Sequence, residues 1–188
     1  MKLKSTYRIV LVASLLCYSC HSPSEIRKEF NCEPSTCNNL ETVADLNALF
    51  SVDLPKNWKI NLYQDEVQSS IFAADTTKQL TQTVLLDVTY ISNKINFDDT
   101  FLLKQEQEYL SENLIKLKTK TFNFQEKPAL YMLFKGKKGK FDYQICNTFI
   151  KVNASNFIFA KTEVYGDSLV NQRLCKAFSL LEKMNIKN

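Results

Sequence analysis

The sequence predicts an α+β fold built on an antiparallel sheet. Strand-like runs lie on both sides of one long helical stretch, and an amphipathic helix closes the chain. The dense pattern begins near residue 40 and contains no internal repeat, so about 150 residues are expected to form one domain. A content of 45% hydrophobic and 23% charged residues excludes a mainly disordered chain.

The first half of this domain is predicted to contain one short helix and four strands. We expect the helix at residues 41–49 and the strands at residues 50–54, 58–63, 70–74 and 83–91. Pro55 ends the first strand because it has no N–H to donate to a neighbouring strand. The run 83–91 is apolar on both of its alternating faces, which predicts a central strand covered on both sides.

The second half is predicted to contain two helices and four strands. Asp98 or Asp99 is expected to cap a helix that runs to about residue 117. The spaced apolar residues of this helix are Leu103, Leu110, Leu114 and Leu117. Strands are expected at residues 119–124, 129–135, 141–152 and 156–164. A final helix is expected at residues 169–184, where Val170, Leu174, Ala177, Leu181 and Met184 recur at helical spacing.

The N-terminus has the pattern of a secretory signal peptide at residues 1–19. Lys2, Lys4 and Arg8 precede a mostly apolar run, residues 9–16. A transmembrane helix would need roughly 20 apolar residues, and a buried N-terminal helix is disfavoured because nothing caps the segment. The three leader cations account for most of the net charge of +4, which therefore gives no support to a nucleic-acid partner.

Cys20 ends a segment that resembles the bacterial lipobox, in which leucine and two small residues precede a cysteine that receives lipid. Ser19 and Cys20 match this motif, whereas Leu16 lies one position too far upstream and Tyr18 is bulky. Ordinary signal peptidase cleavage is the alternative, and it would also cut before Cys20. The resemblance implies a diacylglyceryl thioether, often with a third acyl chain such as palmitate, and hence a lipid bilayer as partner.

These features predict a cell-envelope lipoprotein that faces the periplasm or the cell surface, with the outer membrane favoured. Residues 20–40 are expected to form the lipidated cysteine and a flexible tether, because this segment is polar and contains prolines, serines and asparagines. Residues 41–188 are expected to form the single folded domain.

Four cysteines remain beyond Cys20, and an exported protein meets oxidants that can pair them. Four cysteines allow three connectivities. We expect Cys32 to pair with Cys37 across a short loop and Cys146 to pair with Cys175, with free thiols as the alternative for each pair. A metal site is not expected, because Cys32 and Cys37 lack a second ligand pair and the single histidine, His21, lies beside Cys20.

A family resemblance appears at residues 50–58, which are similar to the opening F-x-(I/V)-x-L-P-x-x-W of PsbP-like domains. Asp75 at a strand end, residues 127–129 entering a strand, and Phe178 in the terminal helix agree in order. The resemblance covers roughly residues 50–184. It implies an antiparallel sheet with helices on both faces, an α/β/α sandwich that serves assembly and binding. It supplies no catalytic motif, cofactor or metal ligands.

Trp58 and a set of strand-spaced aromatic residues are interpreted mainly as core. For Trp58 the alternative is stacking on a ligand. The strand-spaced aromatics are Phe122, Phe124, Phe141, Tyr143, Phe157 and Phe159, and their alternative role is to line a pocket between sheet and helix.

The basic run at residues 135–140 contains a Gly-Lys-Lys-Gly sequence that is similar to the loop that clamps nucleic acid in KH domains. KH domains place that loop between helices, whereas here strand-like runs flank it, so we interpret it as a hairpin tip. A weak anionic surface contact is the remaining alternative. The acid pairs 65–66 and 98–99 are interpreted as turn or helix caps, and residues 153–155 as a hairpin turn rather than a glycosylation site.

The predicted function is therefore a membrane-anchored, non-enzymatic module that binds an envelope protein or a small ligand, without cofactor or nucleic acid. Three glycines exclude a glycine-rich phosphate loop, and one histidine makes a Ser-His-Asp site improbable. Two alternatives stay open. One is an envelope hydrolase that uses convergent carboxylates, and the other is a thiol redox partner that uses Cys32 and Cys37.

Overall fold

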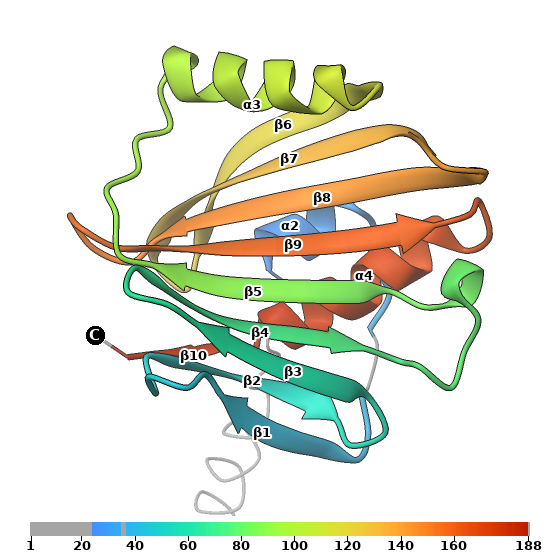
Figure 1. The fold of residues 1–188 in the computed structure, drawn as a ribbon, viewed down its shortest axis with the longest axis horizontal. Helices are drawn as coiled ribbons and strands as arrows, with labels where there is room; N and C mark the ends of the chain where they lie inside the picture. Colours follow the sequence, from blue (N-terminus) through green and yellow to red (C-terminus); the bar gives the residue numbers. More distant parts are fainter. Residues whose placement is uncertain (1–23, 35–36, 188) are drawn as a thin grey trace, which may run out of the picture.

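The computed structural model describes residues 24–34 and 37–187, so the predicted signal peptide and Cys20 lie outside the described residues. Seven antiparallel strands form the main sheet (Figure 1). In spatial order they are β3 (Lys59–Gln64), β4 (Gln68–Ala74), β5 (Leu85–Ile91), β9 (Phe157–Tyr165), β8 (Phe141–Lys151), β7 (Lys127–Lys138) and β6 (Leu114–Phe124). The predicted antiparallel α+β fold is confirmed.

A smaller sheet and four short or medium helices make up the rest of the regular structure in the described residues. The sheet joins β1 (Leu40–Ala44), β2 (Phe50–Pro55) and β10 (Asn185–Ile186). The helices are α2 (Glu25–Glu29), the 3₁₀ helix η2 (Leu80–Gln82), α3 (Asp99–Ser111) and α4 (Val170–Leu181). Figure 1 shows α2 and α4 behind the large sheet and α3 above it beside β6. None of the described helices is both long and apolar enough to cross a bilayer.

The larger core lies between the main sheet, α4 and β2. Phe50 and Leu54 of β2, Leu86 of β5 and Phe178 of α4 are almost completely buried in it. Burial of each such side chain contributes roughly 1.5–3 kcal/mol. Trp58 is 5% exposed in the same cluster, which confirms its interpretation as a core residue.

The second core lies between α3 and the opposite face of the sheet. The Tyr109 ring stacks on Phe134 with centroids 4.4 Å apart, and Phe101 meets the Phe149 ring edge-on at 5.0 Å. The Asp98 carboxylate accepts a 2.9 Å hydrogen bond from the backbone N–H of Phe101, so Asp98 caps α3 as one of the two predicted candidates.

The central position of β5 is confirmed, but cover on both of its sides is not. Leu86 and Val88 are buried on the α4 side, whereas Leu85 and Ile91 on the other side are only half-buried. α3 packs mainly beside β6, and so leaves this part of the sheet less covered.

The helix predicted at residues 41–49 is wrong, because residues 40–44 form β1 and pair with β2. Asp45 ends that strand with its side chain. Its carboxylate accepts hydrogen bonds from the backbone N–H groups of Leu49 at 2.7 Å and Phe50 at 2.8 Å. This geometry closes a hairpin, and tertiary pairing overrides the local helical propensity.

The predicted extension of the long helix to residue 117 is also wrong. α3 ends at Ser111, and Asn113 has a left-handed φ of 62° that stops the helix. Leu114 then begins β6 opposite Gly136. Of the four leucines whose spacing predicts one long helix, Leu103 and Leu110 lie in α3, whereas Leu114 and Leu117 lie in β6.

The flexible tether predicted at residues 20–40 is wrong for the described residues 24–34, which contain α2 packed onto the domain. Ile26 and Phe30 are buried, and the Phe30 ring lies 4.8 Å from that of Phe178. Glu29 contacts Lys118 and Lys120 of β6, and these hydrogen bonds lower the pKa of Glu29 to about 2.

The structure also corrects both cysteine pairings. A disulfide joins Cys32 to Cys175, while Cys37 and Cys146 are free. The contact of α2 with α4 brings Cys32 beside Cys175, which sequence spacing does not reveal. Cys146 is fully buried in β8, and burial raises the pKa of its thiol to about 12.

Candidate functional site

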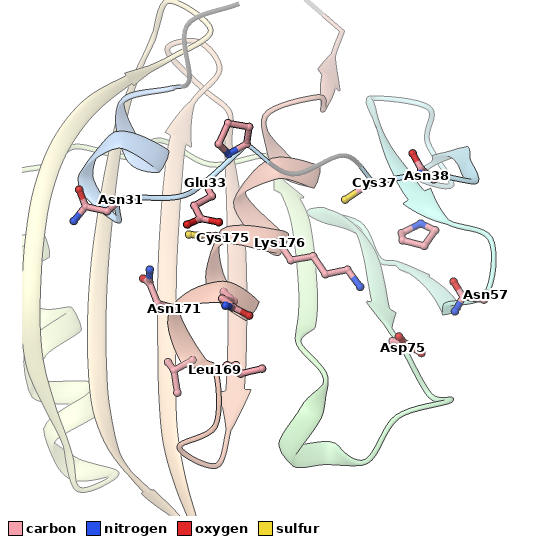
Figure 2. Close-up of a pocket in the computed structure, with 14 residues that line it drawn as sticks. Asn31, Glu33, Cys37, Asn38, Asn57, Asp75, Leu169, Asn171, Cys175 and Lys176 are labelled. Carbon is pink, nitrogen blue, oxygen red and sulfur yellow. The ribbon is translucent and has the colours of Figure 1, made fainter.

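An open groove lies over the N-terminal half of α4, and we call it the α4 groove (Figure 2). It contains a cavity of about 920 Å³ and an adjoining one of about 400 Å³. The two share four lining residues: Asp75, Leu169, Gln172 and Lys176. The shared residues make the cavities two parts of one site.

Three segments far apart in the sequence build the groove. The first half of α4 forms its floor, and the segment that follows α2 forms one wall. The disulfide from Cys32 to Cys175 fastens that wall to the floor. The opposite wall is the turn after β2, where Pro55 ends the strand, together with Asp75 at the end of β4.

Five of the fourteen residues that line the larger cavity have amide side chains. They are Asn31, Asn38, Asn57, Asn171 and Gln172. Each amide both donates and accepts hydrogen bonds, so the surface suits polar ligands such as peptide groups. No aromatic residue is among the described lining residues. The Asn171 amide also donates a 2.9 Å hydrogen bond to the carbonyl of Phe30, which ties the floor to the first wall.

Asp75 is the most enclosed charged group of the groove, with 4% of its surface exposed. One carboxylate oxygen accepts hydrogen bonds from Thr77, at 2.6 Å from the hydroxyl and 3.2 Å from the backbone N–H. The other oxygen has no partner among the described residues. Figure 2 shows Lys176 extending from α4 towards the wall that carries Asn57 and Asp75. Its ammonium lies 5.0 Å from the Trp58 ring centre.

Arg173 fixes the start of α4 and the loops beside it. Its buried guanidinium donates to the carbonyls of Thr83 at 3.0 Å, Tyr165 at 2.8 Å and Ser168 at 2.5 Å. Burial lowers the pKa of Arg173 below its usual value. Leu169 precedes the helix with a left-handed φ of 51°, and no described side chain caps the first turn. The first N–H groups of α4 therefore have no side-chain cap among the described residues.

A second polar cluster lies on the opposite face of the sheet, outside the groove. The Glu163 carboxylate accepts hydrogen bonds from the hydroxyls of Tyr143 at 2.8 Å and Tyr165 at 3.2 Å. Burial by itself would raise the pKa of Glu163, but the Tyr143 hydrogen bond and the charges of Lys161 and Lys138 lower it. The contacts of the Glu163 carboxylate are with tyrosine and lysine side chains of this cluster, so we interpret the cluster as structural.

The structure places the predicted site residues in separate locations. Cys37 and Cys175 line the groove, and the Cys37 sulfur lies 3.5 Å from the Ser179 hydroxyl. Asp65 caps the β3–β4 turn, because its carboxylate accepts from the backbone N–H groups of Val67 and Gln68. Gly139 lies in the tight turn between β7 and β8, which confirms the hairpin tip.

The remaining predicted turns and aromatics are also located. Asn153 accepts a 2.9 Å hydrogen bond from the backbone N–H of Ser155 in the β8–β9 turn, as interpreted from the sequence. Phe122, Phe124 and Tyr143 are buried in the two cores, whereas Phe141, Phe157 and Phe159 are half-buried. No three His, Cys, Asp or Glu side chains of residues 24–34 and 37–187 gather as a metal site would require.

Sequence reasoning missed the groove itself. It noted Asp75 only as the end of a strand, and it assigned the segment at residues 31–38 to a tether. The run Asp75-Thr76-Thr77 after a strand was a weak signal, since aspartate and threonine often bond to each other at such turns. The asparagines that line the walls are spread over the chain and form no motif.

The sequence matches no protein-family model and no curated protein. Solved structures do resemble it. A single-residue mutant of protein Mog1 has a TM-score of 0.53 at 10% identity, covering 79% of this chain and 96% of that chain. The Ran-binding protein Mog1p of Saccharomyces cerevisiae gives the same TM-score and identity, with coverage of 79% and 95%. A structure from Bacteroides thetaiotaomicron has a TM-score of 0.50 at 10% identity, and the match covers 80% of this chain but 49% of that one.

These likenesses define the class of structure. The protein has a Mog1/PsbP-like α+β fold, in agreement with the resemblance seen at residues 50–58. At 10% identity the likeness is one of fold, and function must be argued from the groove.

Proposed function

We propose that this protein is a cell-envelope lipoprotein whose domain binds a protein segment or small ligand in the α4 groove. The observation that carries the proposal is the amide-lined groove, which offers many hydrogen-bonding groups. The yeast protein of the same fold is named for binding another protein, and this supports a protein partner here.

The layout of the acidic groups favours binding over hydrolysis. General acid–base catalysis needs two such groups that converge on one substrate bond. Glu33 and Asp75 both line the groove, but Figure 2 shows them on opposite walls. The two partly buried carboxylates with shifted pKa values, Asp87 and Glu163, lie on the other face of the sheet. The redox alternative requires a pair formed by Cys32 and Cys37, but Cys32 is bonded to Cys175.

The proposed anchor would hold the domain close to the bilayer. Cys20 precedes Ser24 by four positions, and four residues span at most about 14 Å. Ser24 is fixed to the end of α4, since its backbone N–H donates a 2.7 Å hydrogen bond to the Glu182 carboxylate. The α4 residues that line the groove lie in the N-terminal half of the helix, away from Glu182.

Membrane fractionation tests the anchor. Wild-type protein is expected in the membrane fraction and Cys20→Ser in the soluble envelope fraction, because two or three acyl chains are needed for stable attachment. Mass spectrometry of the mature N-terminus should show acylated Cys20. An unchanged distribution of Cys20→Ser, or an unprocessed N-terminus, would reject the lipoprotein part of the proposal.

Site-specific photo-crosslinking in intact cells tests the groove. A crosslinker at Asn57, on the groove wall, is expected to capture a specific adduct. The matched control is a crosslinker at exposed Glu108 on α3, on the other side of the sheet. The same adducts at both positions, or none at Asn57, would show that the groove is not the binding site.

A further inference from the structure

The smaller cavity of the α4 groove has the size and charge of a small-molecule site. Its volume of about 400 Å³ falls at the lower end of the roughly 300–1,000 Å³ typical of ligand pockets. Its charged lining residues are Asp75, Lys78, Arg173 and Lys176. One acid and three bases, from α4 and from the segment between β4 and η2, therefore line one cavity.

Asp75 supplies a carboxylate oxygen that lacks a counter-charge. The residue is 4% exposed, and its hydrogen bonds to Thr77 use one oxygen. No ion pair involves Asp75 in the described part of the chain, although Lys78 and Lys176 line the same cavity. A buried carboxylate is stabilised by a charged donor. A ligand ammonium at the free oxygen would provide one.

Two of the cations that line the cavity are available for an anionic group. Lys78 and Lys176 form no ion pair with any described acidic side chain. The uncapped first turn of α4 adds backbone N–H donors beside Leu169 and Gln172, which line the cavity. Arg173 is different, because its guanidinium is occupied by four backbone carbonyls and holds the cavity wall.

The pattern selects a ligand with both charges. A simple anion would meet the Asp75 carboxylate, and a simple cation would meet Lys78 and Lys176. A compact molecule with one ammonium and one carboxylate offers a partner to both kinds of charge and is neutral overall.

We propose that this cavity binds a small zwitterion with the amino and carboxylate groups of an α-amino acid or a short peptide. The ammonium lies at Asp75, and the carboxylate lies between Lys78, Lys176 and the start of α4. The inference rests on the proposed binding function of the groove and names the chemistry of its ligand. A free amino acid and a dipeptide share this chemistry.

Titration calorimetry of the purified full-length chain tests the proposal. The probes are the twenty amino acids, alanyl-alanine, and two blocked compounds: N-acetylalanine, which lacks the ammonium, and alaninamide, which lacks the carboxylate. At least one zwitterion is expected to bind. Its N-acetylated and amidated forms are expected to bind about tenfold more weakly or worse, since each loses a charged hydrogen bond. Binding confined to single amino acids, or to the dipeptide, identifies the source of the ligand.

Matched variants complete the test. Asp75→Asn keeps the acceptor for Thr77 and is expected to weaken binding of the zwitterion about tenfold. Binding of alaninamide, which keeps the ammonium, should weaken at least as much as binding of N-acetylalanine, which lacks it. Lys78→Gln should weaken binding of ligands through their carboxylate group. The controls Asp142→Asn and Lys94→Gln change exposed charges outside the cavity and should bind as wild type. Circular dichroism verifies that each variant is folded.

The proposal is overturned if no zwitterion binds, if the blocked compounds bind equally well, or if Asp75→Asn binds as wild type. This failure is distinguishable from failure of the proposed function. A specific crosslink at Asn57 would then still show that the groove binds a partner, whereas loss of that crosslink as well would reject the groove as a site.

Discussion

Gly136 lies where β7 passes the loop that leads from α3 into β6. A Cβ at this position would lie 2.5 Å from the carbonyl oxygen of Asn113 and 2.5 Å from Cδ2 of Leu114. The backbone of Asn113 also adopts the left-handed turn that ends α3. Glycine therefore lets the two segments approach closely.

We expect Gly136→Ala to lower the free energy of unfolding by about 1–3 kcal/mol, because the new methyl group must displace backbone. Gly139→Asn is the control: a Cβ at Gly139 meets nothing within 4 Å, and asparagine tolerates a positive φ. Urea unfolding measures both. Equal midpoints for the two variants would contradict the close approach at Gly136.

Folding disfavours the ionised form of the Asp87 carboxyl group. It lies on β5 beside Lys161 of β9 in the strand register. Burial raises the pKa of Asp87, and the charge of Lys161 reduces this rise only partly. The ionised side chain therefore costs stability once the pH exceeds the ordinary aspartate pKa, and the full cost is present above the raised value.

Asp87→Asn is expected to raise Tm at pH 7 by about 2–4 °C, the change that roughly 1 kcal/mol produces in a domain of this size. The gain should disappear at acidic pH, where the wild-type carboxyl is protonated in both states. Thermal unfolding followed by circular dichroism at several pH values measures this dependence, with exposed Asp142→Asn as the control. A gain that persists unchanged at low pH would rule out the ionisation effect.

Among the elements, α2 shows how a five-residue helix becomes part of a domain. Such a helix is unstable alone. Here Phe30 packs against Tyr131 and Phe178, Arg27 pairs with Glu182 at 3.1 Å, and a disulfide closes the segment onto α4. The same disulfide holds one wall of the α4 groove, so stability and site geometry are coupled.

Replacing Cys32 and Cys175 together by serine is expected to lower the free energy of unfolding by about 2–5 kcal/mol, because the bond closes a long loop. The two cysteines are 143 residues apart. Limited proteolysis should then cut first near residues 31–38. Cys37→Ser removes a free thiol and serves as the control, with a small expected effect. Peptide mapping that links Cys32 to Cys37 in the wild type would contradict the structure.

At the scale of the whole molecule, the two sheets share one core. β2 of the small sheet contributes Phe50, Val52 and Leu54 to the same cluster as Leu86 of the main sheet and Phe178 of α4. Trp58, between β2 and β3, lies in this cluster. Contacts of this kind make unfolding cooperative.

The chain has a single tryptophan, so its fluorescence reports on the junction of the two sheets. We expect the urea transitions of Trp58 fluorescence and of far-ultraviolet circular dichroism to coincide, since both sheets contribute to the larger core. The disulfide must stay oxidised during the measurement. An earlier fluorescence transition would show that the small sheet unfolds separately.

The sequence by itself determined the α+β class, most of the strands, the last helix and the tight turns. These follow from local chemistry: alternation along a strand, the missing N–H of Pro55, the capping carboxylate of Asp98, and the positive φ of Gly139. Trp58 was predictable as core for the same reason, because a large apolar side chain beside a strand is usually buried.

Tertiary structure decided what depends on contacts between distant residues. Pairing with β2 made residues 40–44 a strand, and contact with α4 ordered α2 and selected Cys175 as the partner of Cys32. The α4 groove has the same origin, since Asp75 and Lys78 follow β4 whereas Lys176 belongs to α4. The sequence around each residue does not predict this proximity, because the packing of α4 against the strand ends brings their charges together.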